Sequence, residues 1–172
     1  MPGEVFPAMV TAPHPMQLAL VLKLGALIEK NCPDIKVIYT RNTDTFIELY
    51  ERAAIANRNN ADLFISIHCN ANKSTLPIGT ETYLMGLHKS EGNLEVSQRE
   101  NSVVLMEDNY AQNYDGFDPN SPEAYIMFSM NQNAHIDQSI LLASNIENEF
   151  SKSGREDRGV KQAGFLVLWR TT

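Results

Sequence analysis

The sequence is short of cysteine, of basic residues and of long apolar runs. Its 172 residues include two cysteines, Cys32 and Cys69, which form no C-x-x-C pair. It therefore indicates neither a disulfide framework nor a cysteine metal cage. Lys and Arg total 14 against 21 Asp and Glu, giving a net charge of −7, which argues against a nucleic-acid partner. No apolar run approaches the roughly 18 residues that a transmembrane segment needs.

Common catalytic signatures are missing as well. The glycines form neither a P-loop nor a dinucleotide fingerprint, and there is no Gly-x-Ser-x-Gly turn. The four histidines form no His-x-x-x-His or Glu-x-x-His pair, so spacing alone does not predict a metal site. The sequence therefore gives no sign of a P-loop nucleotide-binding protein, a dinucleotide-binding enzyme or a serine hydrolase with that turn. Candidate functional residues must be chosen by their position in the predicted fold.

The first segment, residues 1–15, contains four prolines and neither lysine nor arginine. It lacks the basic and apolar regions of a secretory signal. Because proline fixes φ and removes a backbone donor, we expect an irregular lead-in here. The remainder, residues 16–172, forms the predicted domain.

Helices and strands are predicted to alternate along that domain. With 43% hydrophobic residues, the chain has enough apolar material for one α/β core. Helices are predicted over 16–31 and from a Thr45–Glu48 capping box to about 60, with strands over 36–40, 62–67, 79–85 and 164–169. This order predicts an α/β fold with a mostly parallel sheet flanked by helices.

The pattern changes after Gly86, where a helical insertion is predicted. Residues 91–110 are polar with scattered apolar positions, and the stretch that follows is rich in glycine and proline. Ser121 and Pro122 then have the character of an N-cap and first helical residue, which predicts a long helix to about Phe150.

His68 is the residue best placed for chemistry. It directly follows the predicted strand 62–67, and ligands of parallel sheets bind beyond the carboxyl ends of the strands. A neutral imidazole is a good zinc ligand, although a structural histidine bonded to a nearby loop would fit the same position. Cys69 points away from its neighbour along an extended chain, which disfavours a Cys–His dyad. We expect the other histidines, His14, His88 and His135, to be solvated.

Charged residues gather around the second predicted helix. Arg41, Asp44 and Arg52 lie close together in the sequence. They fit either charge pairing at a helix end or contact with a substrate, and the sequence alone leaves both interpretations open.

An ordered series of motifs resembles a known family. The series is Thr40-Arg41-x-x-Asp44, Leu49-x-x-Arg52, Ala56-Asn57, Ala61-Asp62-Leu63-Phe64-Ile65-Ser66-Ile67-His68-x-Asn70-Ala71, Gly79-Thr80-Glu81-x-Tyr83, Phe128-x-Met130 with Ser139, and Gln162-Ala163-Gly164-Phe165-x-Val167-Leu168. Together these motifs resemble the zinc-dependent N-acetylmuramoyl-L-alanine amidases of cell-wall remodelling, over about 17–170. The resemblance implies a peptidoglycan hydrolase that cuts the amide between N-acetylmuramic acid and L-alanine of the stem peptide.

The resemblance also implies a zinc site made by His, Glu and His, with a second Glu as general base. His68 matches the second zinc histidine. The Gly-His-Gly-Gly turn that carries the first has no counterpart, and Pro13, beside His14, stands at the position of the zinc glutamate. The general base is expected beyond Thr172. Because catalytic zinc normally needs three protein ligands, we expect a domain truncated at both ends, with negligible hydrolysis.

The insertion, residues 89–122, resembles a regulatory element of amidases that act in daughter-cell separation. There a helix plugs the active site until an activator protein moves it, and Arg99-Glu100-Asn101 resembles that helix. The resemblance makes Glu100 a possible autoinhibitory ligand of the metal. The alternative interpretation is a solvated glutamate on an exposed helix.

A second function remains open on the sequence alone. A non-catalytic peptidoglycan-binding module would keep the groove without the metal, with Arg41, Arg52 and Asn70 contacting anionic stem peptides. Either function implies a location in the periplasm or cell envelope, since the wall substrate lies outside the cytoplasm.

Overall fold

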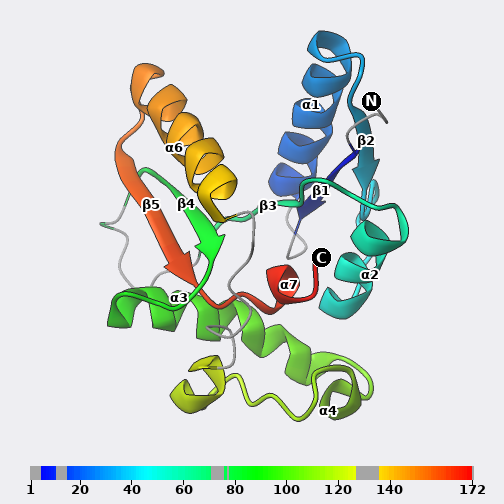
Figure 1. Ribbon diagram of the computed structural model, residues 1–172, viewed down its shortest axis with the longest axis vertical. Coiled ribbons are helices and arrows are strands. Elements are labelled where there is room, and N and C mark those ends of the chain that lie inside the picture. The colour runs from blue at the N-terminus through cyan, green and yellow to red at the C-terminus, as the bar shows by residue number, and fades with distance from the viewer. Residues whose placement is uncertain (1–4, 11–14, 71–75, 77, 127–135, 172) are drawn as a thin grey trace. The chain divides into compact units, whose positions relative to one another are not determined.

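The computed structural model describes residues 5–10, 15–70, 76, 78–126 and 136–171. For residues 5–10 and 15 it describes the backbone alone. The chain divides into two compact units, one of Met1–Asn70 with Leu166–Thr172 and the other of Ala71–Phe165. Both contain parallel strands and helices (Figure 1), which agrees with the predicted α/β class.

The first unit contains a three-stranded parallel sheet in the order β2-β1-β3. Its strands are β1 (Val5–Val10), β2 (Lys36–Tyr39) and β3 (Ile65–Ile67). The expectation of an irregular lead-in over 1–15 is therefore wrong for Val5–Val10. Pro7 removes a single ladder donor and its fixed φ suits extended chain, while the flanking Val and Phe residues favour a strand.

Helix α1 (Pro15–Asn31) packs on this sheet. Val21 is fully buried, with Tyr39 of β2 and Ile67 of β3 packed against it. Gly25 allows the helix to approach, because a Cβ there would lie 1.9 Å from the Tyr39 hydroxyl. The sheet that carries β3 is thus anchored by close contact with α1.

Helix α2 (Leu49–Arg58) buries Leu49, Ala53 and Ala56 and packs against the short helix α7 (Leu166–Trp169). The Asn57 amide donates to the Arg170 carbonyl at 2.6 Å. The predicted helix start at Thr45 is wrong, because the helix begins at Leu49 and Glu48 is its N-cap residue. The Thr45 hydroxyl instead lies 3.0 Å from that of Thr43.

The second unit contains two parallel strands, β4 (Thr80–Met85) and β5 (Asp157–Ala163). Helix α6 (Ile136–Lys152) packs along both strands (Figure 1). The last strand was predicted at 164–169, but those residues include α7 instead. Sequence periodicity missed β5 because the strand is polar and partly exposed, and because Gly159 adopts a φ of +78° beside a break in register.

The helical insertion after Gly86 is present. It comprises α3 (Glu91–Asn101), the 3₁₀ helix η1 (Ser102–Met106), α4 (Tyr110–Asn113) and the 3₁₀ helix η2 (Pro122–Ile126). The buried hydrophobic side chains of the insertion and its connecting turns are Val104, Tyr114, Phe117 and Tyr125. The rings of Phe117 and Tyr125 pack edge to face, with centres 5.2 Å apart.

The long helix predicted over 122–150 is observed as η2 and α6, and its residues 127–135 lie outside the described residues. Across the described parts of the chain, no helix combines the length and apolar character required to cross a membrane.

Candidate functional site

His68 follows β3 directly and is half-buried. Its Nδ1 lies 3.0 Å from the Asn70 side-chain oxygen. With the proton on Nδ1, the ring donates to this oxygen, and the lone pair of a neutral ring then lies on Nε2. A second residue that orients an imidazole in this way is typical of metal-binding histidines.

The described residues nevertheless do not make a zinc site. Among them, no group of three or more His, Cys, Asp or Glu side chains could hold a metal ion. Pro13 and His14, discussed above in connection with a metal, lie outside the described residues, as do Ala71 and the Phe128-x-Met130 motif. The donor set described therefore does not fit catalytic zinc, which takes three protein ligands.

Arg41 and Arg52 hold the loop between β2 and α2. The Arg41 guanidinium donates to the Thr45 carbonyl at 2.9 Å and lies 3.8 Å from the Asp44 carboxylate. The Arg52 Nε donates to the Ile47 carbonyl at 2.6 Å. The two arginines are 7% and 1% exposed, so both serve loop structure here. Their contact with a substrate, which would require the loop to open, stays a prediction.

The remaining predicted site residues fall in different places. Asn70 is exposed and contacts His68, so the structure brings these two together. Glu100 is half-buried on α3, which belongs to the second unit, whereas His68 belongs to the first.

The Gly79-Thr80-Glu81-x-Tyr83 motif has a structural explanation in the second unit. Gly79 has a φ of +106°, and a Cβ there would lie 2.4 Å from the Glu156 carbonyl, so only glycine fits. Glu81 pairs with Lys161 and with Arg158 at 3.3 Å. Burial would raise the pKa of Glu81, but these two cations outweigh it and lower that pKa.

The sequence analysis missed Glu147. This residue of α6 is 3% exposed and accepts a hydrogen bond from the Thr82 hydroxyl. Its position was a usable signal, because a glutamate four residues after buried Ala143 lies on the same helical face.

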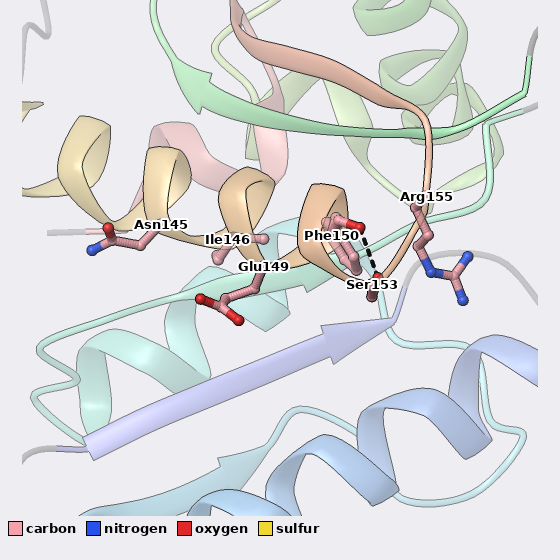
Figure 2. Close-up of a pocket in the computed structure, with 6 residues that line it drawn as sticks. All are labelled: Asn145, Ile146, Glu149, Phe150, Ser153 and Arg155. Carbon is pink, nitrogen blue, oxygen red and sulfur yellow. Dashed lines mark hydrogen bonds between the residues drawn. The ribbon is translucent and has the colours of Figure 1, made fainter.

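A shallow hollow lies at the C-terminal end of α6 (Figure 2). Beside it, the Ser153 hydroxyl donates to the Phe150 carbonyl at 2.7 Å, and the Arg155 guanidinium lies 6.0 Å from the Phe150 ring centre. None of the residues predicted for the site lines it. Its lining residues are Asn145, Ile146, Glu149, Phe150, Ser153 and Arg155.

Parallel strands flanked by helices define an α/β domain, in which His68 stands directly after strand β3. The model of the family Amidase_3, N-acetylmuramoyl-L-alanine amidase, matches residues 11–172. The chain belongs to this family, and its lineage is that of the peptidoglycan amidases.

Curated relatives carry the same name. N-acetylmuramoyl-L-alanine amidase AmiC of Escherichia coli O6:H1 is 32% identical over 157 residues, covering 88% of this chain and 35% of the relative. AmiA of Escherichia coli K12 is 27% identical over 154 residues, covering 88% of this chain and 51% of the relative. The chain thus spans about a third to a half of the length of these relatives.

Solved structures show the fold. An N-acetylmuramoyl-L-alanine amidase from Clostridium difficile 630 matches with a TM-score of 0.58 and 20% identity, over 99% of this chain and 75% of that one. The catalytic domain of CwlV from Bacillus (Paenibacillus) polymyxa matches with a TM-score of 0.54 and 21% identity, over 98% and 75%.

Proposed function

We propose that the protein acts on peptidoglycan, at the amide between the lactyl group of N-acetylmuramic acid and L-alanine of the stem peptide. The observation that carries this proposal is the family match over residues 11–172. His68 supports it, because it stands at the carboxyl end of β3 with its ring oriented by Asn70. Such a substrate implies work in the periplasm or cell envelope.

We further propose that this 172-residue chain alone neither holds catalytic zinc nor hydrolyses peptidoglycan appreciably. Zinc, expected from the family resemblance, would supply Lewis-acid chemistry at the scissile carbonyl. Support for the proposal comes from the donor set, since the described residues contain no cluster of metal-binding side chains.

Zinc content and turnover test this proposal together. Atomic absorption of the purified chain is expected to give far less than one zinc per molecule. Release of stem peptide from purified sacculi is expected to equal that of the His68→Ala variant. Stoichiometric zinc with turnover that His68→Ala removes would overturn the inactivity while supporting the amidase chemistry. Stoichiometric zinc with cleavage of a different bond would overturn the amidase chemistry itself.

We also propose that the insertion, residues 89–122, is regulatory and that an activator protein acts on it. Glu100 would block an active site by ligating its metal. Support comes from the attachment of α3, whose Asn93 amide donates to the Gln162 carbonyl at 3.3 Å and whose Asn101 amide donates to the Gly164 carbonyl at 2.7 Å. These bonds give the helix a defined position.

Substitution of this glutamate tests the regulatory proposal. In a catalytically active relative that has the same insertion, the change equivalent to Glu100→Ala is expected to raise basal stem-peptide release severalfold, because a blocking ligand is lost. The matched control is Glu95→Ala, an exposed position on the same helix, which should leave the rate unchanged. An unchanged rate in the first variant would contradict the role of Glu100.

A further inference from the structure

A buried carboxyl group lies between helix and sheet in the second unit. Glu147 of α6 is 3% exposed, and its Oε1 accepts a hydrogen bond from the Thr82 hydroxyl of β4. Its other oxygen, Oε2, is buried and has no hydrogen-bond partner among the described residues. Buried polar atoms are rarely left in this state, so the orphaned oxygen needs an explanation.

The groups around Glu147 do not neutralise a negative charge. Two other carboxyl groups raise the pKa of Glu147, that of Asp157 on β5 and that of Glu81 on β4. The Asp157 side chain is exposed to solvent. Lys161 and Arg158 of β5 both pair with Glu81. No ion pair of Glu147 itself is found in the described parts of the chain.

Two ionised carboxylates cannot hydrogen-bond to each other, because each can only accept. A proton on one of them converts it into a donor. Asp157 is already oriented, since its Oδ1 accepts a bond from the Gly159 backbone N–H at 2.7 Å. One added proton would therefore give Oε2 of Glu147 a partner and remove a repulsion.

We propose that the buried Glu147 carboxyl holds a proton in the folded protein, with Asp157 as its acceptor, and that loss of this proton loosens α6 from β4 and β5. The pair would make this layer a pH-sensitive element. Burial raises the pKa of Glu147, the Thr82 hydrogen bond lowers it, and Asp157 and Glu81 raise it further, with a net rise.

The sign of the pH dependence follows from that rise. Between the ordinary glutamate pKa of 4.5 and the raised pKa of Glu147 in the folded state, the folded protein holds a proton that the unfolded chain has lost. Stability therefore decreases as pH rises through the folded-state pKa of Glu147, and its contribution is fully present only below the unfolded value.

Urea unfolding of the full chain, measured across the acid-to-neutral range, tests the proposal. The wild-type midpoint should fall as pH rises, while Glu147→Gln should remove this fall, because the amide accepts from Thr82 and donates to Asp157 without titrating. Asp157→Asn should reduce the fall. The matched control is Glu149→Gln on the same helix. The Glu149 side chain is 72% exposed, so this variant should keep the wild-type dependence of the midpoint on pH.

Three results would overturn the proposal. The first is a urea midpoint that depends on pH as strongly in Glu147→Gln as in Glu149→Gln. The second is a Glu147 carboxyl-carbon NMR signal that titrates at or below 4.5 in the wild type, a measurement that decides the matter even if a variant fails to fold. The third is a wild-type slope that calcium abolishes and a chelator restores, since the pair would then hold a cation.

Discussion

Replacing Arg52 with alanine is expected to lower the free energy of unfolding by about 3 kcal/mol. The side chain is 1% exposed, so its removal leaves a cavity in addition to a lost hydrogen bond to the Ile47 carbonyl. The guanidinium also lies 5.8 Å from the Phe46 ring centre, and that contact disappears as well. Equilibrium unfolding in urea measures the change.

The control for Arg52→Ala lies on the same helix. Arg58 is exposed and pairs with Glu51 at 2.6 Å, and surface ion pairs contribute little. Arg58→Ala should therefore change stability by no more than about 0.5 kcal/mol. If Arg52→Ala kept wild-type stability but lost affinity for stem peptides, the residue would serve substrate binding rather than loop structure.

Replacing Asn101 with alanine is expected to destabilise the second unit by about 2–4 kcal/mol. The buried Asn101 amide donates to the Tyr125 hydroxyl at 3.1 Å and to the Gly164 carbonyl at 2.7 Å. Alanine leaves that carbonyl without this donor, and the Tyr125 hydroxyl loses this bond while keeping its bond to the Pro119 carbonyl, at 3.1 Å. Hydrogen exchange should show faster exchange throughout α3 and η2.

Asn113→Ala is the control for the Asn101 variant. Its amide donates to the Asp108 carbonyl at 3.3 Å in a solvent-accessible position, so water can replace the lost bond. We expect little change in stability or exchange. Equal exchange rates in the Asn101 and Asn113 variants would show that Asn101 does not hold the insertion.

The sequence predicted the elements whose pattern is local. The apolar run that ends at Ile67 gave a strand with His68 at its carboxyl end, and Gly79 to Met85 gave β4. The family match confirms the peptidoglycan amidase lineage that the motifs indicated. The roles of individual site residues stay predictions.

The sequence could not predict features that depend on distant partners. Strand β1 forms despite Pro7 because strands on both sides pair with it. Arg41 and Arg52 were candidates for substrate contact, and only the fold shows that backbone carbonyls of the intervening loop use them. Likewise, nothing in the sequence near Glu147 predicts that Asp157 of β5 raises its pKa.

The first unit is discontinuous, and this has a consequence for biosynthesis. Helix α7 lies almost 100 residues after Asn70 yet packs on α2, and Asn57 binds the Arg170 carbonyl. Strands β4 and β5 both belong to the intervening segment, and β5 ends just before α7 begins. The first unit is therefore the last to be fully synthesised, and α2 has no α7 to pack on until both strands of the second unit have been made.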